Sequence, residues 1–423
     1  MRLRSLLAPA LATAILASPA LAAPPRSPEE IAAAALKAAP VWDGHNDVPE
    51  QLRERWHDVL AKFDFADTSG TADPAKGYIA MHTDLARLRR GKVGAQFWSV
   101  YVSAGLTDQQ AVQAVMEQID VTRRLIARYP ADLQFADNAA DVEKALKAGK
   151  IASLLGMEGG YAIGNSPGVL RQFRALGVRY MTLSHFRSTS WADSATDAPK
   201  NNGLSPFGKD VVREMQRIGM LVDLSHTSTR TMLDALDVAR APVIFSHSGA
   251  RAVADHARNV PDEVLARIKA NGGIVMVVSL PAYVSQKARD WALDRAAEKA
   301  RLDARFSEAP DQAKAALAEW EKAHPVPPAT LSDLADHVDH IVKVAGIDHV
   351  GVGGDFDGMD TMTEGFADVS AYPALFAELA RRGYAQADLE KIASRNMLRI
   401  LKAADAYAAA HAADPALESP TVF

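Results

Sequence analysis

The chain has 423 residues, of which 48% are hydrophobic and 23% are charged, as in ordinary soluble globular proteins. A formal net charge of −5, with no basic patch interleaved with aromatic residues, argues against nucleic acid as a partner. Cysteine is absent, which excludes disulfides, thiol nucleophiles and thiolate metal ligands. Any metal site must therefore be built from His, Asp and Glu, which suit zinc and other borderline or hard divalent ions.

The first 22 residues have the pattern of a signal peptide. Residues 1–4 carry two arginines, residues 5–17 form an apolar core too short to span a bilayer comfortably, and Ala20-Leu21-Ala22 fits the small-x-small cleavage pattern. An uncleaved anchor is the weaker alternative, because prolines interrupt the apolar run. We therefore expect an exported protein, periplasmic or secreted, whose mature chain starts near Ala23 and has no stable membrane anchor.

After a predicted leader helix within residues 23–40, short apolar runs alternate with helix-like segments. Eight runs with β-branched or aromatic residues are predicted strands: 41–44, 94–102, 151–157, 179–184, 220–225, 242–246, 273–279 and 349–353. Amphipathic stretches between them are predicted helices: 108–129, 141–148, 206–218 and 262–270. This alternation is typical of parallel βαβ units, so we expect an α/β fold, a (β/α)8 TIM-type barrel over 41–405 with a C-terminal tail at 406–423. An open doubly wound sheet is the alternative, but no Gly-x-Gly-x-x-Gly turn follows the first strand.

Two stretches are longer than a minimal barrel requires and are predicted to be βα-loop insertions. Residues 51–76 form a polar stretch that contains Trp56, Phe63 and Phe65. Residues 287–324 are charged and alanine-rich, which favours a solvated helical excursion. A lid or a dimer contact is the alternative for this second insertion, because βα loops surround the functional mouth of such barrels.

Polar residues with metal-binding side chains stand where the predicted strands end. In chain order these residues are His45 and Asp47, Glu158, His185, His226, His247 and Asp355. Each alone is an ordinary core histidine or ion-pair partner. Because the carboxyl ends of all strands lie on one rim of a barrel, however, we expect the set to converge on a metal site.

The number of candidate ligands favours two metal ions. A single catalytic zinc needs three protein ligands and an open position, whereas the candidates here are five: His45, Asp47, Glu158, His226 and His247. A carboxylate readily bridges two ions, so Glu158 is the predicted bridge. The histidine–aspartate pair of the first strand then completes the ligand set of one ion, and the two later histidines complete the ligand set of the other. Two such ions would hold a hydroxide between them, which leaves His185 and Asp355 for proton transfer or transition-state stabilisation.

The sequence resembles the membrane (renal) dipeptidase family of zinc-dependent dipeptidases, within the amidohydrolase-like barrels. The similar segments, in chain order, are WDGHNDVP, TDLARLRRGKVGAQFWSVYV, GMEGG, RYMTLSHF, GLSPFGKDVVREMQRIGMLVDLSH, SHSGARAV, RNVPDEVL, GGIVMV and HVGVGGDFDG. With the stretches between them they extend from about residue 41 to about residue 400. Each segment is moderately specific, and the set in this order is highly specific.

The resemblance implies a binuclear zinc dipeptidase, with two Zn²⁺ per chain bridged by Glu158, and the signal-peptide pattern adds the expectation of export. It implies that Asp355 handles the proton of the attacking water, and that His185 contacts the substrate and stabilises the oxyanion. Arg258 matches the arginine expected to hold the substrate carboxylate, since its planar fork suits a carboxylate, and Asn259 is expected to bind substrate or orient that loop. Dipeptides with a C-terminal D-residue are included among the expected substrates.

Some features separate this chain from the family pattern. Ser279-Leu280-Pro281 stands where many relatives have an aromatic residue, and Tyr283 is a candidate replacement in the substrate wall. Dimer disulfides do not carry over, although a homodimer is compatible with the resemblance. The alternative functions are a binuclear hydrolase of lactams or other amides and esters, and a non-catalytic binding barrel. The second of these would predict a broken ligand set, whereas the set here is complete.

Overall fold

The computed structural model describes residues 26–418, so the predicted signal peptide lies outside the described residues. Eight parallel strands close into a barrel and a ninth lies beside it, in the order β2-β1-β9-β8-β7-β6-β5-β4-β3, with β2 also paired to β4. The strands are β1 (Val41–Asn46), β2 (Val93–Ser99), β3 (Leu133–Phe135), β4 (Ile151–Glu158), β5 (Val178–Thr182), β6 (Leu221–Asp223), β7 (Ile244–Phe245), β8 (Ile274–Val277) and β9 (Val350–Val352). The predicted (β/α)8 barrel is confirmed.

The strand that the sequence did not predict is β3, which stands outside the closed ring. It pairs with the first half of β4, from Ile151 to Ser153, and β5 pairs with the second half of β4 on from Leu155. Since β3 has only three residues, it is too short to show a strand pattern of its own.

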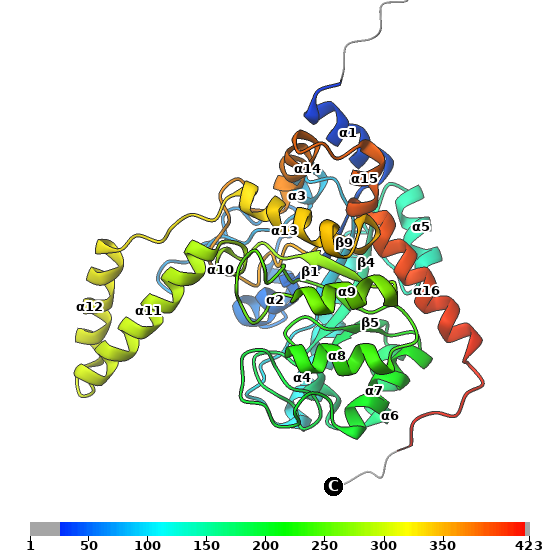
Figure 1. Ribbon diagram of the computed structural model, residues 1–423, viewed down its shortest axis with the longest axis horizontal. Helices are drawn as coiled ribbons and strands as arrows, with labels where there is room; N and C mark the ends of the chain where they lie inside the picture. Colours follow the sequence, from blue (N-terminus) through cyan, green and yellow to red (C-terminus); the bar gives the residue numbers. More distant parts are fainter. Residues whose placement is uncertain (1–25, 419–423) are drawn as a thin grey trace, which may run out of the picture.

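Helices follow the strands and surround the barrel (Figure 1). The helices of the barrel body are α1 (Pro28–Ala38), α2 (Val48–Trp56), α3 (Leu85–Arg90), α4 (Asp108–Arg128), α5 (Ala139–Lys147), α6 (Pro167–Ala175), α7 (Pro206–Arg217), α8 (Thr229–Val238), α9 (Asp262–Asn271), α13 (Leu331–Val344), α14 (Tyr372–Arg381), α15 (Gln386–Glu390) and α16 (Asn396–Ala410). The short turns are η1 (Leu60–Lys62), η2 (Gly160–Ile163), η3 (Ile347–His349), η4 (Val369–Ala371) and the π-helical η5 (Lys391–Arg395). Within residues 26–418, no helix combines the length and the apolarity needed to cross a bilayer.

Local sequence signals explain where several helices begin. Thr107 and Gln110 form a capping box at the start of α4. Ser205 caps α7 by accepting a hydrogen bond from the Gly208 N–H at 3.2 Å, and Pro206 occupies the first turn, where no backbone donor is needed. These caps fix where each helix leaves the rim, and so they fix the loops that carry the site.

The first insertion is held to the body by its aromatic residues. Phe63 and Phe65 are 3% and 0% exposed, although the stretch around them is polar. The Phe65 ring packs edge-on against Trp98, with ring centroids 5.9 Å apart. The stretch after α2 is therefore anchored in the core rather than free in solvent.

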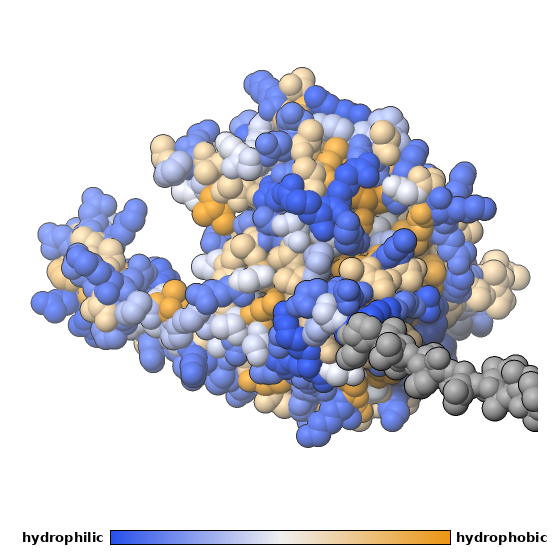
Figure 2. Space-filling model, turned by 90° about the horizontal axis from the view of Figure 1, so that it is seen from above, coloured by the Kyte–Doolittle hydropathy of each residue, from blue (hydrophilic) through white to orange (hydrophobic). Residues whose placement is uncertain are grey.

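The second insertion is a helical hairpin, here called the arm, made of α11 (Gln286–Arg305) and α12 (Pro310–Ala323). It leaves the body after the short helix α10 (Pro281–Val284) and projects away from the barrel (Figure 1). In the space-filling view it stands clear of the body and is mainly hydrophilic (Figure 2). A helical excursion at this place agrees with the prediction.

The barrel interior supports the site from below. Phe97 of β2 and Tyr180 of β5 have ring centroids 4.9 Å apart, although their strands are not neighbours in the sheet. Both rings must therefore lie inside the barrel. Trp42 of β1 joins them, with its ring centroid 5.8 Å from that of Phe97, so that packed aromatic rings form a floor beneath the strand ends.

The C-terminal residues described continue past the predicted end of the barrel at residue 405. Helix α16 runs to Ala410, and the chain then returns to the body. The Leu417 N–H donates to Glu214 at 3.2 Å, and Arg171 donates to the Leu417 carbonyl at 3.0 Å.

Candidate metal centre and substrate pocket

The structure brings the predicted strand-end residues together at the carboxyl rim of the barrel. His45 and Glu158 lie within the last two residues of β1 and β4, and the others follow their strands within three residues. Three convergent groups of possible ligands form there: His45, Glu158 and His247; Glu158, His185 and His226; and His45, Asp47 and Asp355. All the predicted metal ligands are buried.

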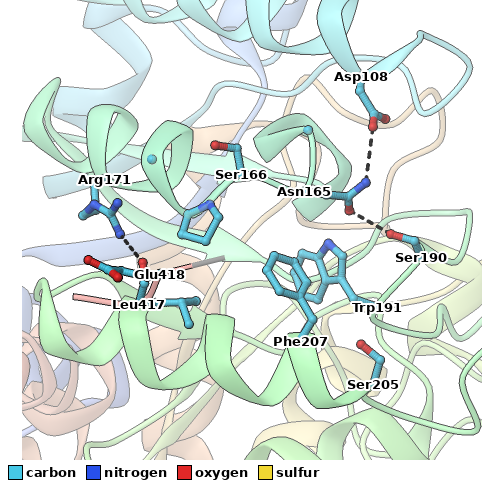
Figure 3. Close-up of a pocket in the computed structure, with 13 residues that line it drawn as sticks. Asp108, Asn165, Ser166, Arg171, Ser190, Trp191, Ser205, Phe207, Leu417 and Glu418 are labelled. Atoms are coloured by element: carbon cyan, nitrogen blue, oxygen red, sulfur yellow. Dashed lines mark hydrogen bonds between the residues drawn. The ribbon is translucent and has the colours of Figure 1, made fainter. Parts of the chain in front are cut away.

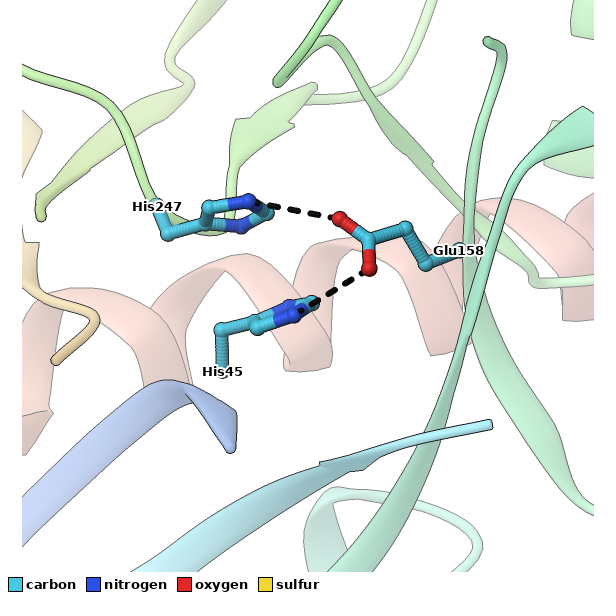
Figure 4. A group of neighbouring side chains, drawn as sticks. All are labelled: His45, Glu158 and His247. Atoms are coloured by element: carbon cyan, nitrogen blue, oxygen red, sulfur yellow. Dashed lines mark ion pairs between the residues drawn. The ribbon is translucent and has the colours of Figure 1, made fainter. Parts of the chain in front are cut away.

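Glu158 belongs to two of these groups, and Figure 4 shows its two carboxylate oxygens facing His247 and His45. Its Oε1 lies 3.0 Å from His226 Nε2 and 3.3 Å from His247 Nε2. Its Oε2 lies 3.5 Å from His45 Nε2, on the other side. His45 Nε2 in turn lies 3.3 Å from Asp47 Oδ2. The two oxygens of one carboxylate thus face two different sets of donors.

The Asp47 side chain does not cap the helix that follows it. Asp47 occupies the N-cap position of α2, where an aspartate normally accepts a hydrogen bond from the helix backbone, yet its side chain makes no capping bond. The carboxylate points to His45 instead. The proline at position 49 helps the helix to begin, because its fixed φ suits the first turn.

Partners outside the cluster orient the histidines. His45 Nδ1 lies 2.8 Å from the Tyr180 hydroxyl, and His247 Nδ1 lies 2.8 Å from the Ser246 hydroxyl. Ser246 donates to Asp223 at 2.7 Å. In both histidines the Nδ1 is occupied and the Nε2 faces the centre, which is the arrangement that orients metal-binding imidazoles.

Electrostatics favour lone pairs at the centre. Burial lowers the pKa of His226 and of His247 well below the usual range, so both rings are neutral. Burial alone would raise the pKa of Glu158, but the neighbouring His45 and His185 hold it well below its usual range. A carboxylate and neutral imidazoles therefore point at one another, with the two Nε2 atoms 2.9 Å apart.

This donor set fits a metal. Two neutral ring nitrogens and a carboxylate oxygen within about 3.3 Å of one another crowd lone pairs together, and a cation relieves that repulsion. The ligand types are those of zinc and other borderline ions, as the lack of cysteine requires.

Asp355 lies beside this centre in a strained backbone conformation. Its φ is 62° and that of His226 is 65°, a left-handed region that costs non-glycine residues about 1–2 kcal/mol. The Asp355 N–H donates to the His45 carbonyl at 3.3 Å. Burial raises the pKa of Asp355 to about 8, and the negative charges of Asp47 and Glu158 add to this shift.

Two neighbours hold the Asp355 loop in place. Asp43 accepts from the His45 N–H at 3.2 Å and from the Gly354 N–H at 2.9 Å, and burial raises its pKa to about 6. Gly358 lies so close that a Cβ there would stand 2.3 Å from Asp47 Oδ2 and 2.8 Å from Asp355 Oδ1. Only glycine leaves room for both carboxylates.

A cavity of about 150 Å³ opens over the centre. It is lined by Asp47, Glu50, Tyr101, Glu158, His185, Phe186, His226, His247, Arg258, Leu280, Tyr283, Asp355 and Gly358. No residue of the arm lines it, so the arm is not a lid in this conformation. Burial lowers the pKa of His185, so its ring is neutral, and the Nε2 lies 3.8 Å from Glu158 Oε1.

Arg258 is a buried cation without a counter-charge. Its side chain is 1% exposed and makes no ion pair with any carboxylate within residues 26–418. Its guanidinium donates to Ser248 Oγ at 3.3 Å and to the His247 carbonyl at 3.2 Å, and its Nε has no hydrogen-bond partner there. Tyr283, the candidate wall residue, lies with its ring centroid 5.4 Å from the guanidinium carbon. A buried charge of this kind requires an anionic partner.

Asn259 does not line the cavity. Its side-chain oxygen accepts from the Gly249 N–H at 2.9 Å, and its amide nitrogen donates to the carbonyls of Ala254 and Tyr283, each at 2.8 Å. Every strong contact of the side chain is thus with backbone, which places Asn259 in the support of the Arg258 loop.

Sequence reasoning missed three side chains of the cavity. Glu50 lies in the first turn of α2, three residues after Asp47, and Tyr101 follows the end of β2. Phe186, next to His185, is 51% exposed at the mouth of the cavity. The i+3 spacing of Glu50 from Asp47 on one helix face was the available signal for that residue. Burial raises the pKa of Glu50 to about 9, and the charges of Asp47 and other nearby carboxylates add to it.

A larger cavity of about 860 Å³ lies elsewhere, by the starts of α6 and α7 (Figure 3). Trp191 and Phe207 form part of its wall, and Asn165 is hydrogen-bonded to Ser190 at 2.7 Å. It shares no lining residue with the cavity over the metal centre, and none of the convergent groups found within residues 26–418 lies in it. Size alone therefore does not mark the reactive site.

A closed parallel barrel with a histidine–carboxylate cluster on its carboxyl rim defines a metal-dependent hydrolase of the barrel type. The model of the membrane dipeptidase family, peptidase family M19, matches residues 29–415. The chain belongs to this family and is a metallo-dipeptidase, which confirms the resemblance seen in the sequence.

Relatives agree with this assignment, and solved structures agree with the fold. An uncharacterised dipeptidase of Schizosaccharomyces pombe is 40% identical over 390 residues, 89% of this chain and 83% of the relative. The dipeptidase tcpJ of Claviceps purpurea is 41% identical over 377 residues, 87% of this chain and 77% of the relative. The probable dipeptidase PvdM from Pseudomonas aeruginosa has a similar structure, with a TM-score of 0.75 at 25% identity, covering 90% of this chain and 99% of the other. A metallopeptidase from Rhodobacter sphaeroides, solved with a phosphinate mimic of L-Ala-D-Ala, shares the fold, with a TM-score of 0.70 at 23% identity over 86% and 99% of the two chains.

Proposed function

We propose that this metallo-dipeptidase is an exported enzyme with two zinc ions, bridged by Glu158. The observation that carries the proposal is the division of donors around Glu158, whose two oxygens face separate groups. Asp47 and His45 would hold one ion, and His226 and His247 the other. The signal-peptide pattern of residues 1–22 supports export.

The side chains of the cavity divide the work of peptide hydrolysis. When bound, the two ions supply a nucleophilic hydroxide at neutral pH and stabilise charge that develops on the attacked carbonyl. Arg258 binds the free carboxylate of the dipeptide, because its charge is buried and otherwise uncompensated. His185 donates a hydrogen bond to the developing oxyanion from the Nε2 side that faces the centre.

Asp355 acts as the general base and then as the general acid. It takes a proton from the attacking water and delivers it to the amide nitrogen, so that the C–N bond breaks and a neutral amine leaves. A carboxyl group beside the attacking water is suited to both steps, and Asp355 stands in one convergent group with His45 and Asp47.

We also include dipeptides with a C-terminal D-residue among the substrates. The mimic of L-Ala-D-Ala held by the Rhodobacter protein of the same fold supports this choice. A cavity of about 150 Å³ suits small side chains such as alanine.

Metal quantification of the purified mature protein, combined with hydrolysis of L-Ala-L-Ala and L-Ala-D-Ala, tests the proposal. We expect two zinc ions per chain and turnover of both dipeptides. One ion per fully active chain would overturn the binuclear centre. Turnover of L-Ala-L-Ala alone would remove the D-residue from the substrate class. Cell fractionation checks export, since a cytoplasmic enzyme with an uncleaved start would contradict that part.

A further inference from the structure

Glu50 and Arg258 line the same cavity without forming an ion pair with each other. Glu50 shares the lining of the cavity with three other carboxylates, those of Asp47, Glu158 and Asp355. Arg258, by contrast, stands beside Tyr283 and the His247 carbonyl. The cavity therefore presents a cationic side and a separate acidic side.

Within residues 26–418 the Glu50 carboxylate has no hydrogen bond and no ion pair. It is partly buried, so it has lost part of its hydration without gaining a protein donor. The start of α2 favours an acid through the helix dipole, but the dipole does not require the side chain to line a cavity. Glu50 also belongs to none of the three convergent metal-binding groups. The carboxylate thus remains free for a ligand.

A dipeptide has its own separation of charge. If its carboxylate binds Arg258, as in the function proposed above on which this inference rests, its N-terminal residue extends toward the other side of the cavity. That residue carries an α-ammonium group and, in Lys or Arg, a side-chain cation. Either group provides the donors that Glu50 lacks.

We propose that Glu50 is a specificity-determining residue that binds a cationic nitrogen of the substrate's N-terminal residue. The contact complements that of Arg258 and selects molecules with a positive and a negative group one dipeptide apart. A cation bound beside Glu50, whether a metal ion or the substrate ammonium, favours the ionised form of this carboxyl group.

The test compares the Glu50→Gln holoenzyme with Glu54→Gln as a matched control. Glu54 lies one turn further along α2, is exposed and does not line the cavity, so its substitution removes the same charge without the contact. The substrates are Ala-Ala and Lys-Ala. The binding probes are two phosphinate dipeptide mimics, one with and one without the amino group, measured by calorimetry with zinc content recorded for each variant.

We expect Glu50→Gln to raise KM by about 10- to 100-fold, the range for a lost hydrogen bond to a charged group, with little change in kcat. Its preference for the amino-bearing mimic should fall by a similar factor, Glu50→Asp should restore part of it, and Glu54→Gln should behave as wild type. An equal effect on both dipeptides identifies the α-ammonium group, and an effect on Lys-Ala alone identifies the side-chain cation.

The inference is overturned if Glu50→Gln binds both mimics with wild-type affinities and also keeps the wild-type KM for Lys-Ala, or if it loses affinity equally for the two mimics. Because binding is read without turnover, failure of wild-type enzyme to hydrolyse either dipeptide would overturn the proposed function and leave the mimic comparison intact. Loss of zinc from Glu50→Gln would instead make Glu50 part of the metal centre and would also refute the assignment.

Discussion

Replacement of Arg258 by methionine removes the buried charge while keeping a side chain of similar length. A carboxylate about 4 Å from the guanidinium, at an effective dielectric constant of about 20, interacts with it by about 4 kcal/mol. Screening by solvent is small, because Arg258 is 1% exposed. Since about 1.4 kcal/mol is a factor of ten, we expect kcat/KM for L-Ala-L-Ala to fall about a thousandfold.

The assay compares L-Ala-L-Ala with its C-terminal amide, which lacks the anionic group. Wild-type enzyme should prefer the free acid strongly, and Arg258→Met should lose that preference while the amide rate changes little. Arg251→Met is the control for damage to the loop, since Arg251 donates to the Asn259 and Ala257 carbonyls and does not line the cavity. Its effect should be small and equal on both substrates. An equal loss on acid and amide in Arg258→Met would refute the carboxylate contact.

Three further outcomes follow from the same geometry. Glu158→Gln removes the shared anion, so metal analysis should find fewer than two ions per chain; two retained ions would refute the bridge. Asp355→Asn should keep both ions and lose turnover by about 10²- to 10⁴-fold, the usual range for a general acid–base, whereas loss of an ion would make Asp355 a ligand. Burial lowers the pKa of His337 to about 4, although the Val284 carbonyl, 2.9 Å from its Nε2, favours the protonated ring. Its Nδ1 accepts from the Ala250 N–H at 2.8 Å, which keeps that nitrogen unprotonated. Between pH 6.5 and 4 the unfolded chain binds a proton at His337 that the folded chain does not, so this residue makes folding less favourable as pH falls. The loss is about 2 kcal/mol from pH 7.5 to 5, and urea unfolding of His337→Gln should lack it; the same pH slope in both proteins would contradict this assignment.

The metal-binding residues at the strand ends could be predicted from the sequence, because the carboxyl ends of all strands of a barrel lie on the same rim. For Asp47 and His226, a position at the end of an apolar run was enough to predict a place in the site. The acidic side of the cavity could not be found in this way, since Glu50 lies on a helix where an acidic first turn is ordinary. Phe186 could not be predicted for a different reason. An exposed aromatic residue indicates a substrate contact only when the cavity beside it is known.

The support of Arg258 likewise required the folded chain. The sequence placed Asn259 beside the arginine, but its bond to the Tyr283 carbonyl joins segments 24 residues apart in the chain. Contacts over such a distance have no local pattern. The role of Asn259 in supporting the loop therefore follows from its contacts in the folded chain and not from its position in the sequence.

The arm has its own small core, made of Leu302, Ala313 and Leu317 with Phe306 packed against them, separate from the two clusters of the barrel. So small a core contributes little to global stability, and its loss would leave the barrel contacts intact. The arm is therefore a cooperative unit of its own. Its amide hydrogens should exchange with solvent through local opening, long before those of the barrel strands, whose exchange requires the whole domain to unfold.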